Sequence, residues 1–150
     1  MPHTYSNLLV HAVFSTKDRI RWLDEELRSR LFPYMGGVVR EIGGTGRLVN
    51  GTEDHVHMLV SLPVDLCVAD CMRLVKANSS RWVHEQSTRY RAFAWQAGYG
   101  AFTVSASNEK QALAYIRNQE SHHSRMTFQQ EFIALLRKHG VAFDEGFLWK

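Results

Sequence analysis

The fold of this 150-residue chain is decided by the stretch DHVHMLVSLP, residues 54–63. Its β-branched and aliphatic residues predict a strand over residues 55–62, which Pro63 ends because proline cannot donate a ladder hydrogen bond. Side chains alternate between the two faces of a strand, so Val56, Met58, Val60 and Leu62 share one face and His55 and His57 share the other. This strand therefore predicts a sheet with one face packed on an apolar core.

Working outward from this strand, hydrophobic periodicity and turn residues predict the remaining elements. On its N-terminal side we expect a strand over 5–14, a helix over 24–42 that Pro33 kinks or delays, and a strand over 47–50. On its C-terminal side we expect a helix over 68–86, short strands over 93–96 and 99–105, and helices over 107–123 and 127–139. The order predicts an α+β, ferredoxin-like (split βαβ) fold. An antiparallel sheet carries helices on one face and is followed by a C-terminal tyrosine-bearing helix.

Length and composition restrict the class of protein. With 45% hydrophobic and 22% charged residues, the chain is typical of a soluble globular protein, and we expect one domain over residues 1–150. No stretch approaches the ~20 apolar residues that span a bilayer, and no secretory signal is expected at the N-terminus. Two cysteines, Cys67 and Cys71, exclude a disulfide scaffold and favour a reduced, cytoplasmic thiol pair.

Positive charge is unevenly distributed along the chain. Basic residues outnumber acidic ones between Arg73 and Arg125, whereas the rest of the chain carries a slight acidic excess. Within that region, aromatic residues such as Trp82, Tyr90 and Trp95 alternate with arginines, a composition that suits phosphate contacts and base stacking. The alternative is that the charges form a solvated face and that the tryptophans are core residues.

The two histidines of the central strand are candidate metal ligands. His55 and His57 project together, with about 6–7 Å between their Cα atoms, and two imidazoles on a rigid strand can bind a divalent ion. In the helix over 107–123, Tyr115 and Gln119 are four residues apart and share a face, which adds a phenol and an amide oxygen. The alternatives are a histidine pair on a half-exposed sheet face and a tyrosine in the core or an interface. For His122 and His123, structural or solvent roles are favoured over a place in the metal shell or a phosphate contact.

Several motifs together resemble one known family. They are LVHAVFSTK (9–17), DHVH (54–57), KANSSRW (76–82), WQAGYGAF (95–102), YIRNQESHH (115–123) and FLW (147–149). Over nearly its whole length the chain resembles the single-tyrosine transposases of the HUH endonuclease superfamily, which includes the repeat-associated tyrosine transposases. The His-hydrophobic-His motif that names the superfamily corresponds to His55-Val56-His57, and the tyrosine followed one turn later by a glutamine corresponds to Tyr115 and Gln119.

The resemblance implies a chemistry. It implies that His55, His57 and Gln119 hold Mg²⁺ or Mn²⁺ and that Tyr115 attacks a DNA phosphate, leaving a 5′-phosphotyrosine and a free 3′-OH. It implies that the substrate is single-stranded DNA with hairpins at element ends. Candidate DNA-binding residues on the second helix and beyond are Arg73, Lys76, Arg81 and Arg91.

The resemblance also implies an assembly and a compartment. It implies a homodimer in which the tyrosine helix of one subunit can complete the metal site of the other, in a cytoplasmic, nucleoid-associated protein that does not contact membranes. Two alternatives stay open: a non-catalytic ferredoxin-like nucleic-acid-binding module, and a domesticated repeat-associated single-strand nuclease. The base that removes the phenol proton is unassigned.

Overall fold

The computed structural model describes residues 3–149, and the ends of the predicted domain, residues 1, 2 and 150, lie outside that range. Its centre is a four-stranded sheet in the order β2-β3-β1-β4. The strands are β1 (Leu8–Ser15), β2 (Thr45–Gly51), β3 (His55–Leu62) and β4 (Gly100–Val104). β1 pairs antiparallel with β3 and β4, and β2 pairs antiparallel with β3. The predicted ferredoxin-like α+β fold is thus confirmed.

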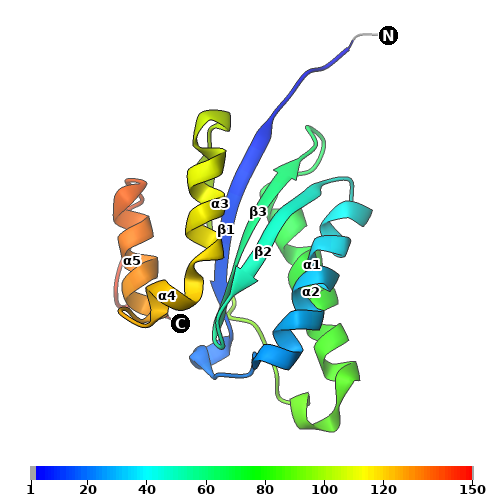
Figure 1. Cartoon of the computed structure of the whole chain (residues 1–150), viewed down its shortest axis with the longest axis vertical. Helices are drawn as coiled ribbons and strands as arrows, with labels where there is room; N and C mark the ends of the chain where they lie inside the picture. The colour runs from blue at the N-terminus through cyan, green and yellow to red at the C-terminus, as the bar shows by residue number, and fades with distance from the viewer. Residues whose placement is uncertain (1–2, 150) are drawn as a thin grey trace.

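Two long helices, α1 (Glu25–Glu41) and α2 (Val68–Gln86), cover one face of the sheet (Figure 1). The Asp24 carboxylate caps α1 by accepting a hydrogen bond from the Leu27 amide at 2.8 Å, and α1 then runs through Pro33 without a break. The apolar face of β3, including Val56 and Met58, is buried against these helices. The predicted apolar face of the central strand is confirmed.

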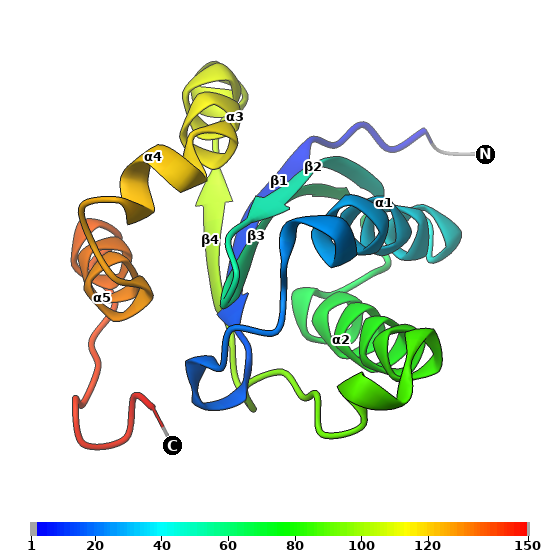
Figure 2. The ribbon, with the colours of Figure 1, turned by 60° about the horizontal axis from the view of Figure 1, so that its bottom comes forward.

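Three further helices, α3 (Glu109–Arg117), α4 (Gln119–His123) and α5 (Phe128–Lys138), cover the opposite face (Figure 2). Phe128 and Phe132 of α5 pack on Phe102 and Val13. Ile116 of α3 packs on Leu9 of β1 and Leu59 of β3. The sheet therefore separates two layers of helices. Within residues 3–149, no helix is both long and apolar enough to cross a membrane.

The predicted helix over 107–123 is wrong as a single helix, because the chain breaks at Asn118 between α3 and α4. Asn50 on β2 explains the break. Its side-chain amide donates to the carbonyls of Ile116 at 2.9 Å and Arg117 at 3.3 Å, which a continuous helix would pair with later backbone amides. This tertiary contact therefore lies at the C-terminal end of α3, which stops at Arg117, two residues before Gln119.

The predicted strand over 93–96 is also wrong. Within it only Trp95 forms a bridge, to Thr16, and two backbone hydrogen bonds flank this bridge, from the Gln96 amide to the Ser15 carbonyl at 2.9 Å and from the Lys17 amide to the Ala94 carbonyl at 2.8 Å. Side-chain contacts add to them. The Trp95 indole donates to Ser79 Oγ at 2.9 Å, and the Gln96 side-chain carbonyl accepts from the Ser15 amide. The interpretation of Trp95 as a core residue is confirmed, since it is buried against the α1–α2 side.

Candidate metal and tyrosine site

The two histidines of β3 point into the layer between the sheet and α3–α5. Both are completely buried, so the alternative of a half-exposed histidine pair is wrong. The Nδ1 atom of each ring has a fixed partner: His55 Nδ1 lies 2.8 Å from Asp54 Oδ1, and His57 Nδ1 lies 2.8 Å from His11 Nε2. These contacts orient both rings with their Nε2 atoms toward the same space.

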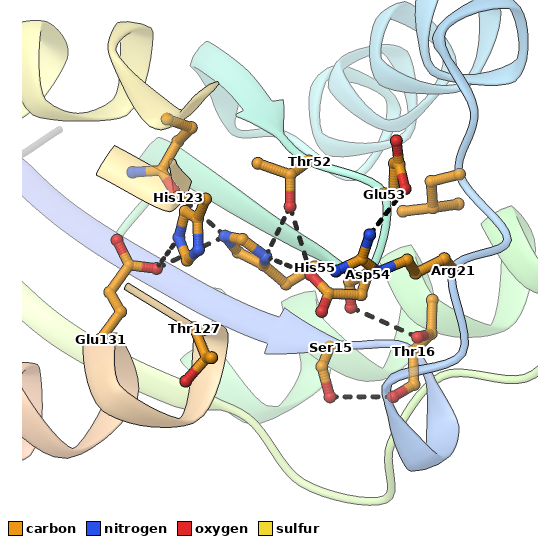
Figure 3. Close-up of polar contacts among 12 residues, drawn as sticks. Ser15, Thr16, Arg21, Thr52, Glu53, Asp54, His55, His123, Thr127 and Glu131 are labelled. Carbon is orange, nitrogen blue, oxygen red and sulfur yellow. Dashed lines mark hydrogen bonds and ion pairs between the residues drawn. The ribbon is translucent and has the colours of Figure 1, made fainter. Parts of the chain in front are cut away.

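A carboxylate from α5 lies at the point where these nitrogens converge. Glu131 Oε1 is 3.0 Å from His57 Nε2, 3.4 Å from His55 Nε2 and 2.8 Å from His123 Nε2. Figure 3 shows His123 and Glu131 facing the His55 ring. One ligand atom from each of these four residues falls within 4.8 Å of the others. We call His55, His57, His123 and Glu131 the histidine–glutamate cluster.

The tyrosine and glutamine of the predicted site reach the same cluster. Gln119, buried at the start of α4, has its Oε1 3.0 Å from His55 Nε2. The Tyr115 hydroxyl, at the end of α3, donates a hydrogen bond to Glu131 Oε2. A single chain thus brings together the four residues that the sequence singled out.

Burial and hydrogen bonding set the charges in the cluster. Burial alone would raise the pKa of the Glu131 carboxyl, but hydrogen bonds from His123, His55 and His57 outweigh it and hold that pKa below its usual range. Burial would lower the pKa of His55, yet its hydrogen bonds with Asp54 and Glu131 raise it to about 9. Burial lowers the pKa of His57 to about 4. Glu131 is therefore an anion that faces a charged and a neutral imidazole.

The phenol of Tyr115 is kept protonated by the same environment. Burial and then the negative charge of Glu131 raise the pKa of the Tyr115 hydroxyl above its usual value. The hydroxyl is consequently a hydrogen-bond donor to Glu131 Oε2. A positive charge placed beside the cluster would lower the pKa of the Tyr115 hydroxyl and so oppose the effect of the Glu131 carboxylate.

The donor atoms fit a divalent ion. The cluster offers imidazole nitrogens and a carboxylate oxygen, and Gln119 adds an amide oxygen. Nitrogen and oxygen donors of this kind bind first-row divalent metals in proteins. Asp54 supplies the carboxylate that commonly supports a metal-binding histidine from behind.

Sequence reasoning missed two members of the cluster. For His123 a structural or solvent role was favoured over a place in the metal shell, and Glu131 was not considered. A signal for Glu131 was present in α5, where Phe128, Phe132 and Leu135 form an apolar stripe on one side of the helix. Glu131 lies within that stripe and is buried, and an acid in such a position needs a polar or cationic partner.

The predicted DNA-binding residues lie in the α1–α2 layer, on the other side of the sheet. On α2, Arg73 pairs with Asp70 at 3.6 Å and Arg81 donates to Asn78 Oδ1 at 2.6 Å. The Lys76 ammonium donates to the carbonyls of Gln96 and Gly98 at 2.6 and 2.9 Å. Arg91 is exposed in the segment after α2. The structure does not bring these residues to the histidine–glutamate cluster.

Comparison with solved structures supports the fold. A provisionally assigned transposase from Deinococcus radiodurans R1 superposes with a TM-score of 0.61 at 22% identity, over 79% of this chain and 95% of that chain. A repeat-associated (REP) tyrosine transposase bound to a REP hairpin superposes with a TM-score of 0.62 at 14% identity, over 84% of this chain and 74% of that chain. At these identities the likeness shows the fold alone. A search of curated proteins gave no significant match.

The family is shown by the sequence itself. The family model described as "Transposase IS200 like" matches residues 4–119, which include β1–β4, the histidine pair, Tyr115 and Gln119. The matched range ends before α5 and therefore before Glu131. The chain belongs to the family of IS200-like transposases.

Proposed function

We propose that the chain is a metal-dependent transposase that cleaves and rejoins single-stranded DNA through a 5′-phosphotyrosine. The observation that carries this proposal is the meeting of Tyr115 and the β3 histidines at one carboxylate, Glu131. Nucleophile and metal donors thereby share one buried cluster. Because Glu131 comes from α5, beyond the matched range, we propose that residues 1–150 act as one domain.

We propose that His55, His57 and Gln119 hold the ion, with His123 and Glu131 as further ligands. When bound, a divalent ion would polarise the scissile phosphate and stabilise the departing oxygen. Mg²⁺ and Mn²⁺ are both candidates. The number of imidazole nitrogens favours Mn²⁺, because Mg²⁺ binds mainly through oxygen ligands.

The role of Tyr115 is nucleophilic attack. Its Oη forms a bond to phosphorus while the bond from phosphorus to the 3′ oxygen breaks, which leaves the 5′ phosphate on the tyrosine and a free 3′-OH. The covalent link allows a 3′-OH to attack in the reverse step, so strands can be rejoined without ATP. Glu131 Oε2 holds the phenol hydrogen before the attack and orients the hydroxyl.

The substrate and assembly form part of the proposal. Arg73 and Lys76 line a groove of about 490 Å³ together with Trp95 and Tyr99, which suits the backbone and bases of a DNA hairpin. With Arg81 and Arg91 they are the proposed hairpin contacts. We propose a homodimer on DNA, although within one chain Gln119 already reaches His55 and Tyr115 already reaches Glu131.

The test is a covalent-adduct assay with hairpin-containing single-stranded DNA and Mn²⁺. A 3′-labelled strand should migrate with the protein on a denaturing gel, because the 5′ end of the downstream fragment is attached to Tyr115, whereas a 5′-labelled strand should give a shorter free product. Tyr115→Phe should give neither, and the matched change Tyr5→Phe, at an exposed tyrosine, should give both. Binding without any adduct in the wild-type protein would contradict the proposal and favour the non-catalytic module.

A further inference from the structure

A cavity of about 700 Å³ adjoins the histidine–glutamate cluster at the end of the sheet where β1 stops and β3 begins. Four arginines line it: Arg19 and Arg21 after β1, Arg28 on α1, and Arg125 between α4 and α5. His123 belongs to both the cavity wall and the cluster. The cavity therefore leads from solvent directly to the proposed ligands.

The cavity carries positive charge that its own acids do not neutralise. Of the acids in its wall, Glu53 pairs with Arg21 at 3.6 Å and Glu120 pairs with Arg28 at 3.3 Å. Asp54 pairs with His55 instead, as Figure 3 shows. Among residues 3–149, Arg19 and Arg125 have no acidic side chain in ion-pair range, so two guanidinium groups are available to an anion.

The backbone places one of these arginines in an unusual turn. Asp18 and Arg19 both have φ of 56°, a left-handed conformation that costs non-glycine residues of order 1 kcal/mol each. The turn is held by Thr16, whose hydroxyl donates to the Ile20 carbonyl at 2.7 Å and whose carbonyl accepts from the Arg19 amide at 3.0 Å. The Arg19 guanidinium lies 5.3 Å from the centre of the Trp149 ring. Arg19 is consequently fixed on the cavity wall.

We propose that this cavity binds the sugar-phosphate backbone of single-stranded DNA beside the phosphate that is cut, with Arg19 and Arg125 contacting phosphates. Guanidinium groups bind phosphate through paired hydrogen bonds, and the cavity has the volume of a small-ligand site, which admits the backbone of one strand and excludes a duplex. The inference rests on the proposed function, because it assigns the route by which the cleaved strand reaches the cluster. It concerns residues outside the groove that Arg73 and Lys76 line on α2.

The test measures binding of fluorescein-labelled oligothymidylate, which forms no hairpin, to the full chain in EDTA by fluorescence anisotropy. The double variant Arg19→Gln/Arg125→Gln should bind about tenfold more weakly. Its salt dependence should also fall, with the slope of log K against log salt smaller by about 1.4, because each single-strand phosphate contact contributes about 0.7. The matched control Arg40→Gln/Arg47→Gln removes two exposed arginines from α1 and β2 and should leave affinity and slope unchanged.

Arg125→Gln alone guards against a folding defect in the Arg19 turn, since Arg125 is an exposed residue outside the helices. It should lower the slope by about half as much. Unchanged slopes in both arginine variants, an equal loss in the control, or equal competition by duplex DNA or inorganic phosphate would each overturn the inference. The adduct assay reports separately on the proposed function: an adduct without an arginine effect overturns only the cavity, and an arginine effect without an adduct overturns only the transposase chemistry.

Discussion

The two faces of the sheet are built from the same strands but differ in polarity. On the α1–α2 side, β3 contributes Val56, Met58 and Val60 to a continuous apolar core. On the α3–α5 side, the same strand contributes His55 and His57 to a buried polar cluster with Glu131. Every buried side-chain nitrogen and oxygen within residues 3–149 has a hydrogen-bond partner, so the polar face is as well satisfied as the apolar one. Strand alternation thus lets one segment contribute to the apolar core on one face and to the histidine–glutamate cluster on the other.

Two neighbouring residues of β3, one on each face of the sheet, should have opposite effects on metal binding and stability. His57→Ala should lower Mn²⁺ affinity at least 100-fold in calorimetric titrations, because it removes a proposed ligand. Met58→Ala, one residue away on the other face, should destabilise the fold by about 2–5 kcal/mol through the cavity it leaves. In the fraction that remains folded, its Mn²⁺ affinity should match wild type. Loss of Mn²⁺ binding in the folded Met58→Ala variant, or full retention in His57→Ala, would contradict the division between the two faces.

Addition of metal should stabilise the α3–α5 layer more than the α1–α2 layer. At Mn²⁺ concentrations 100-fold above Kd, the free energy of unfolding should rise by about 2.7 kcal/mol relative to protein in EDTA. Amide hydrogen exchange should slow most in α4 and α5, which carry His123 and Glu131, and least in α1 and α2. Equal protection of both layers would show that the ion does not bind at the histidine–glutamate cluster.

Asp54 should have a smaller effect because it acts through His55. Its carboxylate lies 2.8 Å from His55 Nδ1, and loss of such a supporting contact lowers metal affinity by about tenfold. Asp54→Asn should therefore weaken Mn²⁺ binding by that amount. Asp65→Asn, an exposed aspartate outside the site, should have no effect. A loss of the size expected for His57→Ala would mean that Asp54 is itself a ligand.

The smallest expected effect concerns the break between α3 and α4. Asn50→Ala removes the donor to the Ile116 and Arg117 carbonyls and should cost about 1 kcal/mol of unfolding free energy. Because Gln119 begins α4 directly after the break, the variant should also form the DNA adduct more slowly than its modest loss of stability explains. An unchanged adduct rate would indicate that Gln119 does not depend on this contact for its position.

The sequence predicted the parts of the molecule that depend on local periodicity. The alternation in β3 predicted both the apolar face and the paired histidines. Tyr115 and Gln119 both reach the cluster, but they do so from α3 and α4 and not from one continuous helix. The break at Asn118 was not predictable from local pattern, because Asn50, whose side chain binds the carbonyl of Ile116 there, lies 66 residues away in sequence. Segment 93–96 was mistaken for a strand for a similar reason, since Ser79 and Ser15 hold it by contacts that local patterns do not encode.

The site was predicted only in part, because some of its members come from segments that only the folded chain brings together. His123 and Glu131 join the cluster only because α4 and α5 fold back over the histidine face of the sheet. Glu131 left a local trace, as an acid within the apolar stripe of α5. The basic residues of α2 were prominent in composition, whereas Arg19 and Arg125, far apart in sequence, became neighbours of one cavity only in the folded chain.

A crystal structure of the Mn²⁺-soaked protein, with anomalous scattering used to locate the metal, would show whether the histidine–glutamate cluster binds the ion. We expect an anomalous peak within bonding distance of the Nε2 atoms of His55 and His57, with Gln119 Oε1 as a further ligand and the Tyr115 hydroxyl beside it. Absence of metal at the histidine–glutamate cluster under saturating Mn²⁺, or a peak at a separate site, would contradict this expectation.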